Sequence, residues 1–323
     1  MAMAPVAAPR VSVIIPAYNA AGFVADAIAS ALAQTQPGLE VIVVDDGSAD
    51  ATWAAILECA AADPRVVPLR QPRQSGPSAA RNAALAVARG DWIALLDADD
   101  LFAPERLARM IRHAEATGAD LLADDLLKCD FATGTALGRC FGEQMEAWTA
   151  PLSLRDLVLG DMPDLRQTQH AKLGFLQPIM RREFLRQHGI RYAEDVTTSE
   201  DFLFYFECVA RGARFLLLPE PLYIYRLRGG SVSNGGVAPL HVSRANRRML
   251  GIARAVGDQA LTRLLRQRQR LLDFNSFALA IRRGWLGVAL RHVQYGGPQL
   301  LLRQLRLVGG ALRQQFSLAD GAR

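Results

Sequence analysis

The chain has 323 residues, of which 50% are hydrophobic and 21% charged, and its formal net charge at pH 7 is +5. This is enough apolar material for a large core, and the length corresponds to two domains or to one large domain with an appendage. No apolar run approaches the ~18–20 residues of a membrane-spanning helix, and residues 1–10 lack the features of a signal peptide, so we expect a cytoplasmic protein. The four cysteines form no C-x-x-C pair and accompany no histidine cluster, which argues against a zinc site or a disulfide framework.

Charge is distributed unevenly along the chain. Residues 241–323 contain 15 arginines and three acidic residues (about +12), whereas the first 240 residues contain 22 basic and 29 acidic groups (about −7). Only two lysines, Lys128 and Lys172, are present. We attribute the arginine bias to genomic base composition and expect no nucleic-acid partner.

The first 125 residues alternate between short β-branched runs and segments with helical apolar spacing. The expected strands span residues 11–15, 39–44, 65–69, 91–96 and 119–123. The expected helices span residues 20–34, 51–62, 77–89 and 104–117. This alternation predicts an α/β fold with a doubly wound, mostly parallel sheet and helices on both of its faces. Such sheets bind ligands at the carboxyl ends of their strands.

The second half of the chain is less regular. We expect one helix near 152–159, a second that ends at Gly189 and a third over 199–211. We also expect strands at 215–218 and 222–225, separated by Pro219 and Pro221. After Asn246 the chain is helical and rich in arginine. The predicted organisation comprises an N-terminal tail at 1–10, an α/β domain at 11–235 with halves at 11–125 and 126–235, and a basic helical region at 241–323.

Acidic residues follow two of the expected strands. Asp45 and Asp46 come after one strand, and Asp97, Asp99 and Asp100 come after another. Asp97 and Asp99 can both face a hard cation because the intervening Ala98 points away, and carboxylate oxygens suit Mg²⁺ or Mn²⁺. The alternative interpretations are a helix cap for residues 97–100 and an ordinary turn before Gly47.

Four segments carry a resemblance to a known family: Pro16-Ala-Tyr-Asn19, Asp45-Asp-Gly-Ser48, Gly76 to Asn82, and Asp97-Ala-Asp-Asp100. In this order they resemble glycosyltransferase family 2, whose fold is called GT-A, over about residues 10–230. Ser199-Glu-Asp-Phe202 looks like the family's Glu-Asp signature, and residues 225–233 look like its arginine and serine segment near the pyrophosphate. The alternatives are a helix capping box and a surface loop, respectively.

The resemblance implies a metal-dependent, inverting transfer of a sugar from a nucleotide-sugar, most commonly a UDP-sugar, to an acceptor hydroxyl. Asp201 would be the catalytic base, with Glu200 beside it, and Mn²⁺ or Mg²⁺ would lie on Asp99 and Asp97. The 11–125 half would hold the nucleotide-sugar and the 126–235 half the acceptor. Arg81 would brace Asp45 and Asp46. The residues expected to contact the donor are Pro16, Tyr18, Asn19, Asp45, Asp46, Gly47, Gly76, Arg81, Asp97, Ala98, Asp99, Arg226 and Arg228.

Residues 175–182 depart from the Lys-Leu-Tyr/Phe-Arg-Arg segment of many relatives. The Gln177-Pro178 pair resembles members that build bacterial exopolysaccharides. His170, Lys172 and Gln177 are therefore candidate contacts for a glycan or lipid-linked saccharide acceptor, and a solvated loop is the alternative.

The basic C-terminal region has a mixed composition of leucine and arginine over 261–272 and 282–291, with Trp285. Basic amphipathic helices of this kind suit an anionic membrane surface. The alternative is a helical pair that packs its apolar stripe on the α/β domain.

The rival function from another class is a catalytically silent sugar-nucleotide or glycan-binding protein of the same fold. Intact Asp97, Asp99 and Asp201 argue against it. No glycine-rich loop follows the first strand, which argues against a nucleotidyltransferase or a nicotinamide oxidoreductase.

Overall fold

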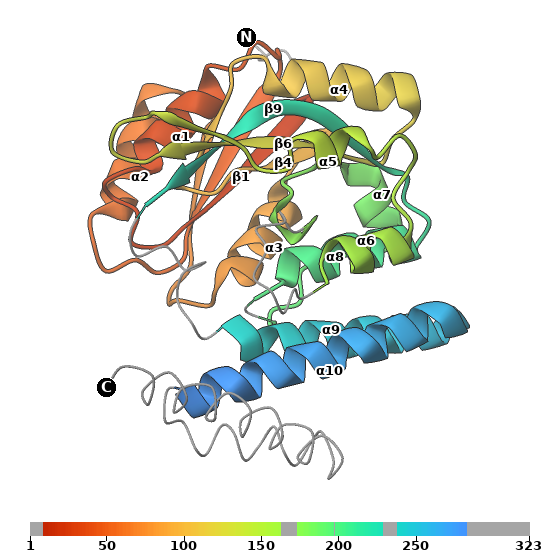
Figure 1. Ribbon diagram of the computed structural model, residues 1–323. Coiled ribbons are helices and arrows are strands. Elements are labelled where there is room, and N and C mark those ends of the chain that lie inside the picture. Colours follow the sequence, from red (N-terminus) through yellow and green to blue (C-terminus); the bar gives the residue numbers. More distant parts are fainter. Residues whose placement is uncertain (1–8, 163–172, 197, 229–237, 283–323) are drawn as a thin grey trace, which may run out of the picture. The chain divides into compact units, whose positions relative to one another are not determined.

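The computed structural model describes residues 9–162, 173–196, 198–228 and 238–282 (Figure 1). These residues divide into two compact units. The first unit comprises the described residues up to Arg228, and the second comprises the helices from Ala238 onward.

One mixed sheet forms the centre of the first unit, in the strand order β3-β2-β1-β4-β8-β6-β9-β5, with β7 beside β6. The strands are β1 (Val11–Ala17), β2 (Leu39–Asp45), β3 (Val66–Arg70), β4 (Trp92–Leu95), β5 (Leu101–Phe102), β6 (Leu121–Asp130), β7 (Ala136–Arg139), β8 (Ile179–Arg181) and β9 (Phe215–Leu227). Strands β1 to β4 are mutually parallel, as are β6 and β9, whereas β5, β7 and β8 run antiparallel to their neighbours. The mostly parallel α/β fold predicted from the sequence is confirmed.

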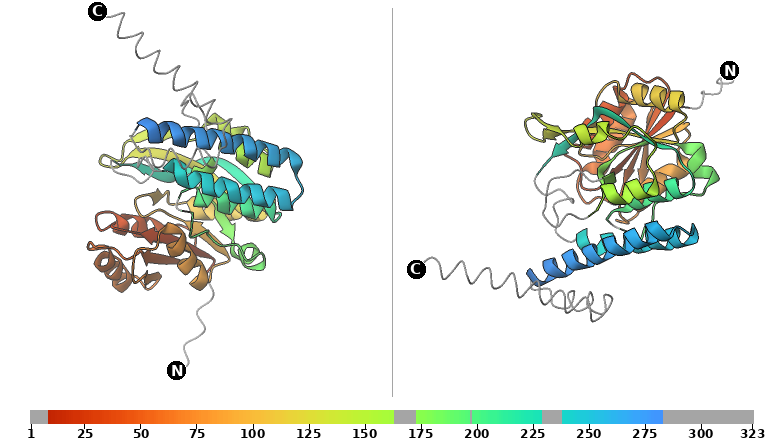
Figure 2. Two further views of the ribbon diagram at one scale, coloured as in Figure 1. Left: turned by 90° about the horizontal axis from the view of Figure 1, so that it is seen from below. Right: turned by 45° about the vertical axis from the view of Figure 1, so that its right-hand side comes forward.

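Helices cover both faces of this sheet: α4 lies on one side, and α3, α6 and α8 lie on the other (Figure 1; Figure 2). The helices of this unit are α1 (Val24–Leu32), α2 (Thr52–Ala62), α3 (Pro77–Val87), α4 (Arg106–Thr117), α5 (Glu143–Glu146), α6 (Leu154–Gly160), α7 (Arg182–Gln187) and α8 (Glu200–Ala210), with a short 3-10 turn at Leu173–Phe175. Every residue of β2 and β4 is buried, as expected for strands covered on both faces.

Strand β9 differs from the prediction, because it is one strand rather than two. Its pairing with β6 shifts register around Asp124 and Asp125, so that Leu218 pairs with Asp124 and Pro221 with Asp125. This irregularity accommodates Pro219 and Pro221, which have no N–H to donate to the ladder. Strands β5, β7 and β8 were not predicted, because runs of two to four residues show no readable periodicity.

The register of the parallel strands determines where the site lies. Ala17 of β1 pairs with Asp45 of β2, and Ile14 of β1 pairs with Leu95 of β4. The segments that follow these strands therefore meet at one edge of the sheet, which contains Tyr18, Asp46 and Asp97.

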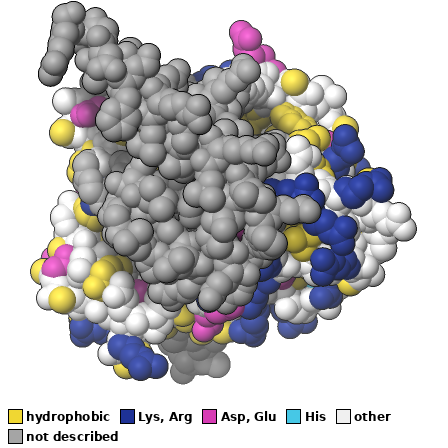
Figure 3. All heavy atoms as spheres, turned by 60° about the horizontal axis from the view of Figure 1, so that its bottom comes forward, with side chains coloured by type: hydrophobic (Ala, Val, Ile, Leu, Met, Phe, Trp, Pro, Cys, Tyr) yellow, Lys and Arg dark blue, Asp and Glu magenta, His cyan; other side chains and the backbone are white. Residues whose placement is uncertain are grey.

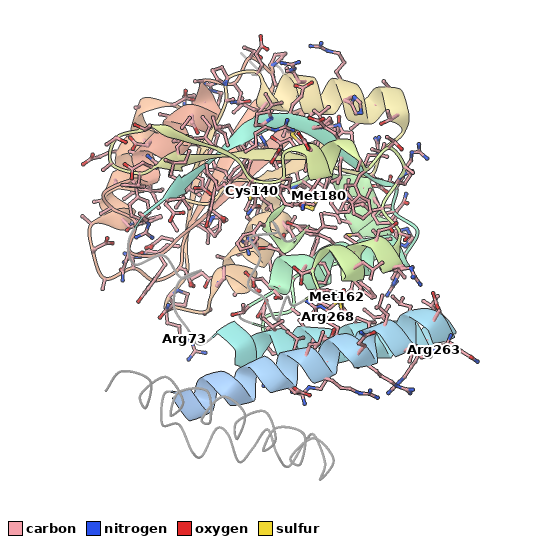
Figure 4. All side chains as sticks on the ribbon, in the orientation of Figure 1. Arg73, Cys140, Met162, Met180, Arg263 and Arg268 are labelled. Atoms are coloured by element: carbon pink, nitrogen blue, oxygen red, sulfur yellow. The ribbon has the colours of Figure 1, made fainter. Side chains whose placement is uncertain are left out.

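The second unit is a pair of helices, α9 (Ala238–Ala255) and α10 (Gln259–Arg282). Hydrogen bonds join them: the Asn246 amide nitrogen donates to the Leu265 carbonyl (3.0 Å) and to Gln269 Oε1 (2.8 Å), and Arg268 Nη1 donates to Asn246 Oδ1 (2.9 Å). Arg268 and the exposed Arg263 both come from α10 (Figure 4). Among the described residues, no helix combines the length and apolar content that a membrane crossing requires.

Candidate functional site

The loops after β1 and β2 hold each other in place. The Asn19 backbone N–H donates to Ser48 Oγ (2.9 Å), and the Ala49 N–H donates to Asn19 Oδ1 (3.0 Å). Asn19 has a left-handed backbone (φ 48°), a conformation that asparagine tolerates better than most residues. The exposed ring of Tyr18 precedes it at the sheet edge.

Asp45 and Asp46 are both buried and bonded within the protein. Asp45 accepts the Ser48 N–H (3.0 Å) and pairs with Arg70 (3.0 Å). Asp46 accepts the N–H groups of Ser75 and Gly76, both at 2.8 Å. The two carboxylates thus fix the turn after β2 and attach it to the loop that leads into α3.

Gly47 lies where this turn meets that loop, and its φ is +68°. A Cβ there would lie 2.6 Å from the backbone of Arg73 and Gln74. Gly47→Ala should therefore cost ~3 kcal/mol or more in the free energy of unfolding, measured in urea. Gly38→Ala is the matched control: its φ is similar (+69°) but its nearest neighbour is at 3.5 Å, so it should cost ~1 kcal/mol. Equal losses would contradict the close-contact argument.

Arg81 connects Asp97, which follows β4, to the start of α8. It lies on α3, its side chain is 5% exposed, and its Nη2 contacts Asp97 Oδ1 at 3.2 Å. Its Nη1 contacts Glu200 Oε1 at 3.1 Å and Asp201 Oδ1 at 3.2 Å. We refer to these four side chains as the Arg81 cluster.

This arrangement corrects one prediction. Arg81 was expected to brace Asp45 and Asp46, but those carboxylates have backbone amides and Arg70 as their partners. Arg81 instead reaches the start of α8, which provides Glu200 and Asp201. A single cation therefore neutralises part of the charge of three carboxylates.

The start of α8 is not the capping box that was the alternative interpretation of Ser199-Glu-Asp-Phe202. Ser199 has a left-handed backbone (φ 63°), and its side chain makes no cap hydrogen bond. A strained backbone of this kind costs energy and persists where the surrounding structure imposes it. Glu200 and Asp201 both reach Arg81 Nη1.

Burial raises the pKa of Asp201 to about 7. The positive charge of Arg81 opposes this rise, whereas the negative charges of Glu200 and Asp97 add to it. A carboxylate with a pKa near neutrality is well suited to accept a proton from a bound hydroxyl group.

Two arginines at the end of β9 lie beside Asp99. Arg228 Nε donates to Asp99 Oδ2 (2.8 Å), and Arg226 Nε donates to the Asp99 carbonyl. The structure thus brings together the predicted pyrophosphate arginines and the strand-end aspartates. Arg226 lies within β9, so the surface-loop interpretation is wrong for this residue. The serines at 231 and 233 lie outside the described residues.

Residues 97–100 do not cap a helix, because the next helix, α4, begins only at Arg106. Asp100 is 1% exposed and accepts the Tyr223 hydroxyl (2.9 Å) and the Arg226 N–H (2.8 Å). The Tyr223 hydroxyl also accepts the Asp97 N–H (3.2 Å). Tyr223 was missed in the sequence, because an aromatic residue in an apolar strand carries no signal of such a role.

Of the three candidate acceptor residues, Gln177 is described, whereas His170 and Lys172 lie outside the described residues. Gln177 is 7% exposed, so it does not belong to a solvated loop. Its Nε2 donates to Asp97 Oδ2 at 3.1 Å, which places it at the Arg81 cluster.

A family model described as Glycosyl transferase family 2 matches residues 12–138. The chain carries a family 2 glycosyltransferase domain. Two relatives from Rhizobium meliloti are the succinoglycan biosynthesis proteins ExoO (40% identical, covering 70% of this chain and 63% of the relative) and ExoU (38%, covering 70% and 65%). The chain therefore spans less than two-thirds of the length of these relatives.

Solved structures support the GT-A fold of the family 2 domain. S. aureus TarS 1–349 in complex with UDP-GlcNAc aligns with a TM-score of 0.62 at 22% identity, covering 82% of this chain and 70% of that one. Mannosyltransferase PcManGT from Pyrobaculum calidifontis, in complex with GDP-Man and Mn²⁺, aligns with a TM-score of 0.57 at 20% identity, covering 97% and 89%. At these identities the likeness shows the fold alone.

The residues that match the family model provide only part of the site. Arg81 and Asp97 lie within 12–138, but Glu200 and Asp201 come from beyond it. The Arg81 cluster thus joins the family 2 core to the second half of the unit.

Proposed function

We propose that this chain is an inverting glycosyltransferase that moves a sugar from a nucleotide-sugar to an acceptor hydroxyl. The Arg81 cluster carries the proposal, because it holds a carboxylate with a pKa of about 7 beside the strand-end aspartates. The names of ExoO and ExoU favour a role in exopolysaccharide assembly, with a glycan or lipid-linked saccharide as acceptor. The TarS complex with UDP-GlcNAc favours a UDP-sugar donor.

In the proposed reaction, Asp201 takes the proton of the acceptor hydroxyl as that oxygen forms a bond to C1 of the sugar. The bond from C1 to the diphosphate oxygen breaks on the opposite face, and its electron pair leaves with the nucleoside diphosphate. A single displacement of this kind inverts the configuration at C1. Arg226 and Arg228, which lie beside Asp99, would stabilise the charge that develops on the diphosphate.

The donor set at Asp97 and Asp99 fits a divalent cation. Their side chains are partly exposed, at 34% and 24%, and carboxylate oxygens suit Mg²⁺ or Mn²⁺. Within the described ranges there is no group of three or more His, Cys, Asp or Glu side chains that could hold an ion by itself. Substrate phosphates usually complete the shell of such ions. When bound, the ion would neutralise negative charge on the leaving diphosphate.

The edge formed by the loops after β1 and β2 is the proposed nucleotide subsite. Tyr18 offers an exposed ring to a base, next to Pro16 and Asn19. Asp45 and Asp46 would act there indirectly, because they hold the turn at Gly47 against the loop at Gly76. We assign most of the donor site to 11–125 and acceptor binding to 126–235, which also provides Arg226 and Arg228 to the donor diphosphate.

The test is the release of nucleotide from UDP-, GDP- and dTDP-sugars with Mn²⁺, with and without EDTA. Turnover of one donor that EDTA abolishes supports the enzyme and its metal dependence together. If calorimetry shows donor binding without release, even with short glycan acceptors present, the catalytically silent binding protein is the better description.

The raised pKa of Asp201 predicts a pH dependence for the active donor. Because the deprotonated carboxylate is the base, kcat/KM should rise about tenfold per pH unit up to pH ~7 and level off above it. The profile is measured from pH 5 to 9 at saturating Mn²⁺. A profile that is flat between pH 5 and 7 would exclude Asp201 as the titrating base.

We also propose that the α9–α10 pair contacts an anionic membrane surface. Arg263, Arg266 and Arg270 are exposed at helical spacing on one side of α10. Lys and Arg side chains, drawn in dark blue, gather at the right of the face in Figure 3.

Flotation of the full chain with vesicles of phosphatidylglycerol and phosphatidylcholine tests this contact. Changing Arg263, Arg266 and Arg270 to Gln should lower the floated fraction several-fold. The matched control changes three exposed arginines of the first unit, Arg155, Arg211 and Arg214, to Gln. An equal loss of floated protein in both triple variants would mean that net charge alone explains the binding. No loss in either variant would contradict the proposal.

A further inference from the structure

Gln177 has a rigidly held backbone. It lies between the 3-10 turn and β8, and Pro178 restricts it to an extended conformation. Its carbonyl accepts from Arg106 Nη2. Arg106 in turn makes two hydrogen bonds to Asp124 (2.9 and 2.6 Å), and both of these charged residues are fully buried. A buried ion pair thus fixes the position from which the Gln177 side chain extends.

The orientation of the Gln177 amide follows from its partner. Asp97 Oδ2 accepts only, so the NH₂ group of Gln177 must face it, and Oε1 points elsewhere. Oε1 is buried and has no hydrogen-bond partner in the part of the chain that the structure describes. An unpaired buried acceptor destabilises the protein, and a donor on a bound ligand would remove this cost.

A second acceptor, Asp201 Oδ1, is buried in the same cluster. Its neighbours are Arg81, which pairs with it at 3.2 Å, and the hydroxyl of Tyr192. Gln177 and Asp201 are linked through Asp97 and Arg81. The unpaired atom, Gln177 Oε1, is an acceptor and therefore requires a hydroxyl or N–H donor. Phosphate oxygens are acceptors and cannot meet this need, whereas sugar hydroxyls can.

We infer that Gln177 is a specificity-determining residue whose Oε1 accepts a hydrogen bond from a hydroxyl group of the transferred sugar. This inference rests on the proposed function. The sequence predicted a contact with the acceptor, but the hydrogen bond to Asp97 places Gln177 at the strand-end carboxylates, where the donor is proposed to bind. Gln177 would therefore discriminate among donors that carry the same nucleotide.

Two substitutions separate the functions of the amide. Gln177→Met removes both the donor to Asp97 and the acceptor oxygen. Gln177→Lys keeps a donor that reaches toward Asp97 but has no acceptor. Gln187→Met is the control, because Gln187 is an exposed glutamine on α7.

Calorimetry measures the affinity of each protein for UDP, UDP-glucose, UDP-galactose and UDP-GlcNAc with Mn²⁺, and for GDP with GDP-mannose and dTDP with dTDP-glucose. The wild type and Gln187→Met should bind one nucleotide-sugar more tightly than its nucleotide. Both Gln177 variants should bind this nucleotide-sugar about tenfold more weakly than the wild type does. Their affinity for the nucleotide should stay within about twofold of the wild-type value.

Three outcomes would overturn the inference. If Gln177→Lys keeps the gain that Gln177→Met loses, Gln177 is a positioning residue for Asp97 alone. If both variants still bind the nucleotide-sugar more tightly than the nucleotide, as the wild type does, Gln177 makes no contact with the sugar. A wild type that binds both with equal affinity leads to the same conclusion. If the wild type binds no nucleotide or nucleotide-sugar at all, the proposed function fails first. Binding of nucleotide-sugar with an unchanged gain in the variants defeats only the Gln177 inference.

Discussion

Asp201→Asn should lower kcat for sugar transfer by roughly 10²–10⁴-fold while leaving donor affinity nearly unchanged. The amide has the shape of the carboxylate but cannot take the proton of the acceptor hydroxyl. The measurement is the initial rate of transfer at pH 8, where the wild-type carboxyl is deprotonated, together with donor binding by calorimetry. Glu183→Gln, a surface substitution on α7, is the control.

Stability distinguishes this loss from unfolding. The pKa of Asp201 is higher in the folded protein than the ordinary value of 3.8, so the buried carboxyl destabilises the fold as pH rises from about 4 through 7. Asparagine carries no charge, and Asp201→Asn should therefore melt at a Tm equal to or above that of the wild type at pH 8. Full activity in a stable variant would remove Asp201 from the mechanism. A lowered Tm would contradict the burial argument.

Arg81→Met should destabilise the protein by ~3–5 kcal/mol, because it removes the cation from among three carboxylates. Without the guanidinium, which lowers the pKa of both groups, the pKa values of Asp97 and Asp201 should rise further. At pH 6 Asp201, whose pKa is already about 7, would then hold its proton and repel the neighbouring carboxylates less. The loss in the free energy of unfolding should therefore be larger at pH 8 than at pH 6, as measured by urea denaturation.

Two further variants test the charge argument. Arg81→Met combined with Glu200→Gln should recover part of the lost stability, because one of the repelling carboxylates is gone. Arg186→Met is the control: Arg186 pairs with Glu183, and both side chains are more than half exposed. It should cost less than ~1 kcal/mol. Equal destabilisation by Arg81→Met at both pH values would mean that lost packing, rather than charge, explains the effect.

The strand-end part of the site was readable in the sequence because local patterns determine it. The long apolar runs of β1, β2 and β4 place Tyr18, Asp46 and Asp97 at one edge of any parallel sheet. The central strands and most helices were predicted within a few residues for the same reason.

The partners of Arg81 could not be read, because they depend on contacts between distant segments. Arg81 and Glu200 are 119 positions apart in the chain. Glu200 and Asp201 follow the left-handed backbone of Ser199 and both reach Arg81 Nη1, and serine carries no signal for that conformation. The position of Gln177 likewise depends on β8, whose three residues are too few to show a pattern.

The place of β8 in the sheet decides whether the nucleotide half can exist alone. Strand β8 lies between β4 and β6, although its residues come long after both in the chain. A fragment ending near residue 138 would leave the fully buried β4 with an open edge of unpaired N–H and C=O groups. Open apolar edges of this kind recruit strands from other molecules. The two proposed halves therefore depend on each other for folding, and such a fragment should aggregate when it is produced separately.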